Sequence, residues 1–229
     1  HNPFSSIGSP VMKYRYNPYS RVTNDYPTEP KDAYVTTNYR VLVENDWLDD
    51  LKYLCEPTEF HEKRITVHFV CDRGVSHEFV RHRVMSFAQE STRYCNYSKD
   101  KFGNELTFIK PCWLDIPTGH YAYWDGDWCD IDKMKIQLPE GEHKDIDAFL
   151  WTLNNAETHY TLLINSGWKP QEARAVLPNS LKTELVMTGF VSDWKHFFEL
   201  RCDSAAHPQA RELAIPLKEE FIKKGYITE

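Results

Sequence analysis

The chain has 229 residues, 41% of them hydrophobic and 14% aromatic, and its formal net charge is −7. This composition supports a sizeable hydrophobic core and excludes a largely disordered protein. The acidic balance disfavours a general nucleic-acid binder, because such a protein needs a broad basic face. A local basic cluster in an acidic chain suits a small anion, such as a phosphate.

The N-terminal quarter of the chain has weak periodicity. Residues 1–31 are rich in Tyr, Pro, Asn and Ser, so we expect an irregular arm there. Residues 34–43 alternate enough to predict a strand. In residues 46–55, Trp47 and the leucines that follow it recur at helical spacing, which predicts a short helix.

The next segment carries a strand and then a basic stretch. Residues 64–71 alternate cleanly between apolar and polar side chains, which predicts a strand with one buried face. Ser76 is a good N-cap, so we expect a helix over residues 77–88. The basic triplet 81–83 would lie on that helix, and Ser91 would lie at or just past its end.

Residues 112–145 are acidic and heavy in Trp and Tyr. We interpret them as an insertion or ornate loop with a small hairpin. The segment that follows is strongly amphipathic and predicts a helix from about residue 146 that ends at Gly167. Pro170 can open the next short helix, over residues 170–177.

The last third of the chain continues with regular elements. Residues 182–190 are expected to form a strand, and Ser192 is expected to cap a helix over residues 193–201. A last helix is predicted over residues 208–223, and there is no internal repeat or linker. We therefore predict a single α+β domain over residues 1–229, with a sheet packed against several helices.

The cysteines suggest a reducing compartment. None of them forms a CxxC pair or a metal-type spacing with His, so we expect free thiols in a cytoplasmic protein. No apolar run approaches transmembrane length, and no signal peptide is visible. The six cysteines are Cys55, Cys71, Cys95, Cys112, Cys129 and Cys202.

A metal site is the first alternative that the sequence raises. His77 and His82 lie in HEFVRH, which has one residue more than the zinc-protease pattern HExxH. Residues five apart on a helix point about 140° away from each other, so the two rings would not share a face. We therefore expect no metal, and metal-dependent hydrolysis stays the weakest of three functional hypotheses.

The basic triplet gathers polar neighbours. Arg81 and Arg83 point to different sides of a helix, and solvated or ion-paired side chains would be their ordinary interpretation. However, residues 89–92 add amide, carboxyl and hydroxyl groups, and Arg93 adds another guanidinium. Guanidinium groups near a helix end together suit a phosphate and a uracil-type ring.

These residues resemble a known family. Arg81-His82-Arg83, followed after seven residues by Ser91, matches the RHR-x7-S signature of the flavin-dependent thymidylate synthases. The segment EARAVLP at residues 172–178, the Leu-Arg ending at Arg201, and AHPQARELA at residues 206–214 are also similar to that family. The resemblance covers roughly residues 45–111 and 145–223.

The resemblance implies an activity and an assembly. Enzymes of this family methylate C5 of dUMP to give dTMP, with methylenetetrahydrofolate as the one-carbon donor and FAD, reduced by NADPH, as the reductant. They are homotetramers whose active sites are built from several subunits, and neither nucleic acid nor a membrane is expected as a partner. The second hypothesis is a non-catalytic nucleotide-binding protein of the same fold.

The resemblance also implies roles for individual residues. Arg201 is expected to stabilise the ionised pyrimidine; Ser91 is a possible nucleophile, although a binding role is favoured because no base is obviously positioned for it. The dUMP contacts are expected to be Glu78, Arg81, Gln89, Glu90, Ser91, Thr92, Arg93, Arg174 and Arg201. The FAD contacts are expected to be Thr58, His61, Arg81, His82, Arg83, Gln89 and His196.

The expected role of Arg201 has a physical basis. Carbon C5 of uracil is a poor nucleophile, and a fixed positive charge near N3 and O2 favours electron density that can flow to C5. Arg is always protonated and suits this task better than Lys. We expect the guanidinium groups of Arg81, Arg93, Arg174 and Arg201 to converge on one nucleotide pocket.

Some positions depart from the family pattern. Glu56 stands where a His is common, His61 where an acidic flavin contact can occur, and Glu78 where a Gln often contacts dUMP. Ala88 replaces a frequent Asn, and Phe190–Ser192 replaces an Asn-x-Arg that touches FAD elsewhere. These changes affect the flavin contacts more than the reaction, because the Arg positions survive.

Overall fold

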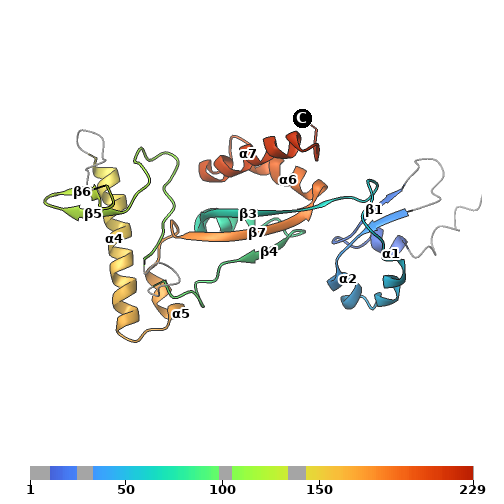
Figure 1. Cartoon of the computed structure of the whole chain (residues 1–229), viewed down its shortest axis with the longest axis horizontal. Helices are drawn as coiled ribbons and strands as arrows, with labels where there is room; N and C mark the ends of the chain where they lie inside the picture. The colour runs from blue at the N-terminus through green and yellow to red at the C-terminus, as the bar shows by residue number, and fades with distance from the viewer. Residues whose placement is uncertain (1–10, 25–32, 98–104, 134–142, 229) are drawn as a thin grey trace, which may run out of the picture.

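The computed structural model describes residues 11–24, 33–97, 105–133 and 143–228. A three-stranded antiparallel sheet forms the middle of the molecule, and a smaller lobe lies at each end of it (Figure 1). Helices pack against one face of the central sheet. The predicted α+β class is therefore confirmed.

The central sheet has the order β3-β7-β4. Its long strands are β3 (Arg64–Asp72) and β7 (Lys182–Phe190), which pair antiparallel from Arg64 opposite Phe190 to Asp72 opposite Lys182. The short strand β4 (Ser86–Gln89) pairs with the other edge of β7. Both predicted strands, over residues 64–71 and 182–190, are confirmed.

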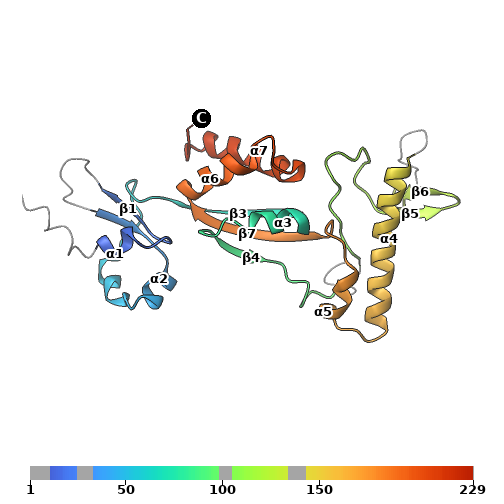
Figure 2. The ribbon, with the colours of Figure 1, turned by 180° about the vertical axis from the view of Figure 1, so that it is seen from behind.

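The two faces of this sheet differ in polarity. Phe69, Leu185 and Met187 are buried beneath α3 (Arg73–Phe79), α6 (Val191–Arg201) and α7 (Pro208–Lys223). Figure 2 shows α6 and α7 along one side of the strands. The other face carries polar pairs, as expected for an antiparallel sheet with one open face. These pairs are Thr66 with Thr188, His68 with Glu184, and Lys182 with Glu184.

The predicted helix over residues 77–88 is wrong in its bounds. Helix α3 begins four residues earlier, because the Asp72 carboxylate accepts a hydrogen bond of 2.6 Å from the Val75 amide and caps the helix. Ser76 lies inside α3, where its hydroxyl donates to the Arg73 carbonyl at 2.9 Å. Residues 81–83 consequently lie in a turn between α3 and β4, and Ser91 follows a strand instead of a helix.

The N-terminal lobe contains α1 (Met12–Arg15), β1 (Arg21–Asn24), β2 (Ala33–Thr36), α2 (Tyr39–Glu44) and the 3-10 helix η2 (Leu48–Tyr53). The irregular arm expected over residues 1–31 is wrong for residues 11–24, which form α1 and β1; residues 1–10 and 25–31 lie outside the described ranges. The strand expected over residues 34–43 ends at Thr36. Asn38 then caps α2 by accepting a hydrogen bond of 3.1 Å from the Val41 amide.

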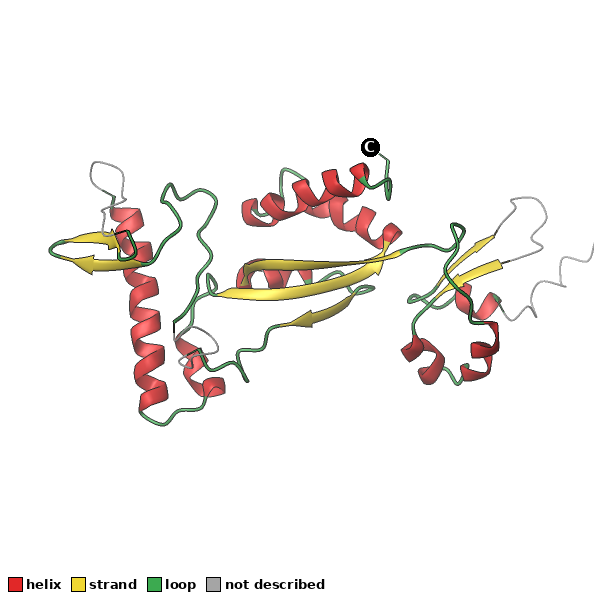
Figure 3. Ribbon diagram, in the orientation of Figure 1, coloured by secondary structure: helices red, strands yellow, loops and turns green. Residues whose placement is uncertain are grey.

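The lobe at the other end contains a hairpin of β5 (Tyr121–Trp124) and β6 (Asp127–Asp130), the long helix α4 (Lys144–Asn165), and the short helices α5 (Pro170–Ala173) and η4 (Arg174–Val176). Figure 3 shows the hairpin beside α4. Trp128, Ile146 and Leu150 form its buried core. The predicted hairpin and both predicted helices of this region are confirmed.

Carboxylates from two segments hold the start of α6. Asp193 accepts a hydrogen bond of 3.0 Å from the Phe190 amide, and Glu62 accepts one of 3.0 Å from the Ser192 amide. Ser192 is therefore not the cap that we predicted, whereas the predicted helix over residues 208–223 is confirmed as α7. Within the described ranges, no helix has the length and apolar character needed to cross a membrane.

Candidate active site

Arg201, at the C-terminal end of α6, is the centre of a polar cluster. Its Nη1 lies 2.7 Å from Glu78 Oε2, and its Nη2 donates to the Glu78 carbonyl at 2.7 Å. Its Nε donates to His82 Nε2 at 3.2 Å. Only 15% of the Arg201 side chain is exposed, so this guanidinium is held in a fixed orientation by three hydrogen bonds.

His82 is a neutral acceptor in this cluster. Burial, together with the charges of Arg201 and His196, lowers its pKa to about 4. Its ring packs against Phe197 with a centroid distance of 5.0 Å, and the His196 ring lies 6.1 Å away. Because Nε2 accepts the Arg201 N–H, the ring proton of His82 belongs on Nδ1.

The two arginines of the triplet lie beside this cluster but are not buried in it. Arg81 and Arg83 are exposed on the turn between α3 and β4, whereas His82 between them is buried. The Arg81 amide donates to the Glu78 carbonyl at 3.3 Å, which ties the turn to α3. Met85, at the end of this turn, is buried in the main hydrophobic core. The turn therefore carries two exposed guanidinium groups beside a buried imidazole.

A second polar group follows β4. Gln89 Nε2 donates to Ser76 Oγ at 2.8 Å and lies 3.3 Å from Thr183 Oγ1. The Glu90 carboxylate accepts from the Tyr97 hydroxyl at 3.2 Å and lies 3.5 Å from Lys182 Nζ. Burial opposes the charge of Lys182, but the hydrogen bond to Glu184 and the charge of Glu90 raise its pKa.

Arg174 joins this second group from η4. Its Nη1 donates to Thr92 Oγ1 at 3.2 Å, while the Arg174 side chain is otherwise exposed. Glu172, which could have paired with Arg174, instead caps α5 by accepting from the Lys169 amide at 2.8 Å. Ser91 Oγ accepts from the Arg93 amide at 3.3 Å, and the Arg93 side chain is exposed over Tyr94. Arg93 and Arg174 are thus available to an anion.

A cavity of about 1190 Å³ lies between the N-terminal lobe and the beginning of β3. Thr58 and His61 line it, and they are bonded to each other: the Thr58 amide donates to His61 Nδ1 at 3.0 Å. The hydroxyl of Thr58 also lies 2.9 Å from His61 Nδ1. The size and the mainly hydrophobic wall of this cavity are typical of a site for a large organic ligand.

Two buried polar atoms of residues that line this cavity lack partners. Thr36 Oγ1 and Arg64 Nε have no hydrogen-bond partner among the described residues. Burial lowers the pKa of the Arg64 guanidinium, and the charge of Asp193 acts in the opposite direction. The atoms themselves are inaccessible, so they do not define the ligand. The size of the cavity, its mainly hydrophobic wall, and the cationic residues Lys63 and Arg64 in its lining fit a large ligand that is both aromatic and anionic, as FAD is.

The candidate residues consequently form three groups in one chain. Thr58 and His61 line the cavity. The turn before β4 is surrounded by Glu78, Arg81, His82, Arg83, His196 and Arg201. The third group consists of Gln89, at the end of β4, Glu90 to Arg93, which follow it, and Arg174, which contacts Thr92. Because β4 has four residues, about 13 Å of strand separates the second group from the third. Arg81 and Arg201 lie on one side of β4, and Arg93 and Arg174 lie on the other. The expected convergence of the four guanidinium groups on one pocket, in the assembled subunits, stays a prediction.

The two histidines of the HEFVRH segment lie in different environments. His77 is exposed on α3, while His82 is buried and accepts the Arg201 hydrogen bond. In the parts of the chain that the structure describes, no group of three or more His, Cys, Asp or Glu is arranged to hold a metal ion.

Comparison with known proteins identifies the family. The family model described as thymidylate synthase complementing protein matches residues 20–224. The chain belongs to this family. The match covers both groups of residues on which the sequence-based resemblance depended, and it extends across residues 112–145, which we had interpreted as an insertion outside the resemblance.

Several curated proteins are similar to this family member. A flavin-dependent thymidylate synthase of Pyrococcus furiosus is 30% identical over 160 residues, which cover 69% of this chain and 53% of the relative. The same protein of Synechocystis is 25% identical over 159 residues, with 69% and 66% covered. A probable flavin-dependent thymidylate synthase of Paramecium bursaria Chlorella virus 1 is 25% identical over 171 residues, with 72% and 69% covered. The chain spans about half the length of the Pyrococcus relatives that it matches.

The sequence analysis missed several residues of these sites. Arg64 and Thr36 line the cavity, and Lys182 lies beside Glu90. Arg64 begins a strand whose alternation places it on the polar face, so periodicity gave no reason to single it out. Its role depends on the N-terminal lobe, which the periodicity of residues 1–31 did not predict.

Proposed function

We propose that this family member is a flavin-dependent thymidylate synthase that converts dUMP to dTMP. The methyl group would come from methylenetetrahydrofolate, and NADPH would reduce the flavin. The observation that carries the proposal is the family match over residues 20–224, together with similar curated proteins that are named flavin-dependent thymidylate synthases. The RHR-x7-S pattern from Arg81 to Ser91 supports the same reaction.

The cavity beside the N-terminal lobe is our proposed flavin site. Thr58 and His61 would hold FAD there, and the positive charges of Lys63 and Arg64, which also line the cavity, suit its phosphates. Arg81, His82 and Arg83 would contribute from the turn before β4, with His196 from α6 and Gln89 from β4. When bound, FAD supplies the reducing equivalents that complete the new methyl group. Around it, the largely apolar wall of the cavity would exclude water.

The proposed catalytic group is Arg201. Its guanidinium is preorganised by Glu78 and His82, so it would meet the uracil ring without reorientation. Because His82 is neutral, it adds no positive charge beside Arg201. Glu78 accepts hydrogen bonds from Arg201, and we expect its carboxylate to orient both the guanidinium and a donor of the pyrimidine ring. Ser91 remains a binding residue in this proposal, because its hydroxyl contacts a backbone amide and no base.

The phosphate of dUMP is assigned to the group after β4. Arg174 and Arg93 are exposed guanidinium groups beside Thr92, Ser91 and Glu90. Hydrogen bonds between guanidinium and phosphate contribute about 1.5–3 kcal/mol each, so two of them supply a large part of the roughly 8 kcal/mol that micromolar binding requires.

We propose a homotetramer with shared active sites, as the sequence resemblance to the family implies. Exposed apolar side chains on both lobes would be covered by neighbouring subunits. They include Leu51, Leu54 and Tyr53 on the N-terminal lobe and Trp113 and Trp124 at the other end. Light scattering after size-exclusion chromatography measures the assembly, and a monomer at catalytic concentration would contradict shared sites.

The function is tested by a spectrum and a turnover assay on the same preparation. The purified protein should bind FAD, show flavin absorbance, and release tritium from C5-labelled dUMP when methylenetetrahydrofolate and NADPH are supplied. Omission of NADPH should stop the release. Binding of dUMP without turnover would instead support a non-catalytic nucleotide-binding protein. A colourless protein that takes up neither FAD nor dUMP would overturn the proposal.

A further inference from the structure

Where the N-terminal lobe joins the central sheet, residues 62–63 form hydrogen bonds with residues 191–192. The Val191 amide donates to the Lys63 carbonyl at 3.1 Å, and the Ser192 amide donates to the Glu62 carboxylate at 3.0 Å. Glu62 and Lys63 line the large cavity. The first turn of α6 is therefore bonded to one edge of the cavity wall.

Arg21, at the start of β1, reaches across to this same turn. Its Nη2 lies 2.6 Å from Asp193 Oδ1, and its Nε donates to Ser192 Oγ at 3.2 Å. The guanidinium also stacks over the Phe190 ring, 4.6 Å from its centroid. Asp193 is almost buried and also caps α6, so Arg21 neutralises a carboxylate on which the helix depends.

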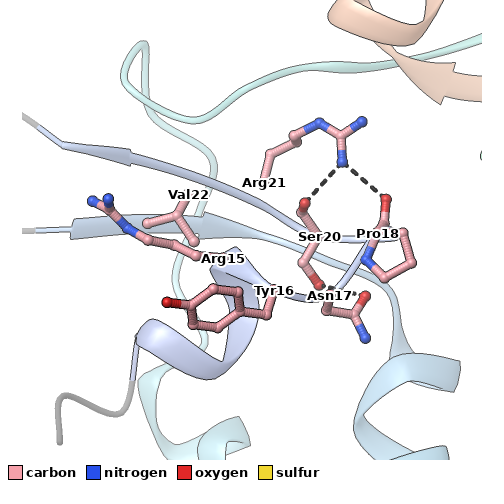
Figure 4. Close-up of a pocket in the computed structure, with 7 residues that line it drawn as sticks. All are labelled: Arg15, Tyr16, Asn17, Pro18, Ser20, Arg21 and Val22. Atoms are coloured by element: carbon pink, nitrogen blue, oxygen red, sulfur yellow. Dashed lines mark hydrogen bonds between the residues drawn. The ribbon is translucent and has the colours of Figure 1, made fainter. Parts of the chain in front are cut away.

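The same guanidinium anchors its own lobe. Its Nη1 donates to the carbonyls of Pro18 and Ser20, each at 2.9 Å, as Figure 4 shows. These bonds form one side of a shallow hollow of about 370 Å³ lined by residues 15–18 and 20–22. A guanidinium has five N–H donors, and four of those of Arg21 are used inside the protein. Arg21 is thus nearly saturated, which suits a positioning residue and disfavours direct binding of a ligand.

This arrangement connects two of the candidate groups. On one side of Arg21 lies the cavity with Thr58 and His61, and on the other side α6 carries His196 and Arg201 at its far end. A rigid helix transmits the position of its first turn to its last. Both the position of the N-terminal lobe and the position of the Arg201 cluster therefore depend on the first turn of α6, which Arg21 contacts.

We infer that Arg21 is a positioning residue that fixes the N-terminal lobe, and with it the wall of the proposed flavin cavity, to the first turn of α6. That the ligand is FAD rests on the proposed function, whereas the anchoring of the N-terminal lobe by Arg21 does not. Loss of the Arg21 guanidinium removes the bonds from β1 to Ser192 and Asp193, so the bonds of Glu62 and Lys63 alone hold the cavity wall against α6. FAD then binds more weakly, although Arg21 itself does not contact it.

Two measurements on the full chain test this inference. Titration of FAD by flavin fluorescence should give a Kd about tenfold higher for Arg21→Gln than for the unaltered protein. Hydrogen exchange without FAD should be faster at residues 191–193, whereas the amides of Phe69 and Leu185 in the central sheet serve as an internal reference. A merely destabilised protein would accelerate exchange at the reference amides as well.

The matched control is Arg40→Gln in the same lobe, where Arg40 pairs with Glu44 on an exposed helix face. It should change neither measurement. Arg21→Lys, which keeps the charge near Asp193 but loses the fork, should give an intermediate Kd and replaces Arg21→Gln if that variant does not fold. Unchanged exchange at residues 191–193, or an unchanged Kd for FAD, overturns the inference. If the unaltered protein binds no FAD, the proposed function fails, and the exchange measurement alone decides the role of Arg21.

Discussion

The two arginine groups on either side of β4 are built in opposite ways. Arg201 is mostly buried and bonded to Glu78 and His82 by its own chain, whereas Arg174 is exposed and makes one side-chain bond, to Thr92. The first group is held by the main core through Phe197 and Phe79. The second depends on short elements at the edge of a lobe.

This difference separates two tasks that one type of side chain can perform. A charge that must act on a developing charge has to be oriented before the ligand arrives, and burial strengthens its field. A charge that must capture a phosphate from solvent is more useful when it is exposed and unsaturated. We therefore expect variants of the first group to alter catalysis and folding, and variants of the second to alter binding alone.

The sharpest test of this contrast is Arg201→Ala. We expect the rate of tritium release from C5-labelled dUMP to fall about 10²–10³-fold, or roughly 3–4 kcal/mol, because an oriented donor to the transition state is lost. Arg40→Ala, on an exposed helix face, is the control and should retain the rate. Retention of more than about a tenth of the activity in folded Arg201→Ala would remove Arg201 from catalysis.

The pH dependence of stability tests whether His82 is buried and neutral in the Arg201 cluster. His82 has a lowered pKa in the folded protein, so between about pH 6.5 and pH 4 the unfolded chain binds a proton that the folded chain refuses. Stability should therefore fall as the pH decreases through this window, by up to about 3 kcal/mol from this group.

Urea unfolding at several pH values measures this contribution. His82→Gln should lack the part of the slope that His82 causes, whereas His77→Gln, at an exposed position of α3, should keep it. Equal slopes in the two variants would contradict a buried, neutral His82.

For the open group, the informative change is Arg174→Ala. The Kd for dUMP should rise about tenfold or more, because a guanidinium-phosphate contact is lost. The free energy of unfolding should change by less than about 0.5 kcal/mol, because the side chain is exposed. Calorimetric titration and urea unfolding give both values. A loss of stability without weaker dUMP binding would show that Arg174 serves the fold instead.

The smallest expected effect comes from Gly189→Ala, beneath the turn that carries Arg81 and Arg83. A Cβ at this position would lie 2.9 Å from Met85 Cγ, and a flexible Met can yield. We expect a loss of about 1 kcal/mol in stability and a few-fold weaker FAD binding. The double variant Gly189→Ala with Met85→Ala should show a favourable coupling energy, and strict additivity would exclude the contact.

The regular elements were largely predictable from sequence. The alternation in residues 64–71 and 182–190 and the apolar stripe after Ile146 each bury one face, so local periodicity alone locates β3, β7 and α4. The order of the RHR-x7-S pattern and the later Arg-containing segments was sufficient for the family. The helix around residues 77–88 failed because two capping residues competed, and Asp72, at the end of a buried strand, prevailed over Ser76.

The amino-acid sequence by itself determined which side chains are present and which strands and helices carry them, because those depend on neighbours within a few residues. Only the tertiary structure decided that Arg201 meets Glu78 across 123 positions of sequence, and that Arg21 meets Asp193 across 172. Such pairs form when separate elements pack on a common core, and no local pattern specifies the partner. For this reason the arginines of both groups could be named in advance, together with Thr58 and His61 of the cavity, whereas their partners and the rest of the cavity wall could not.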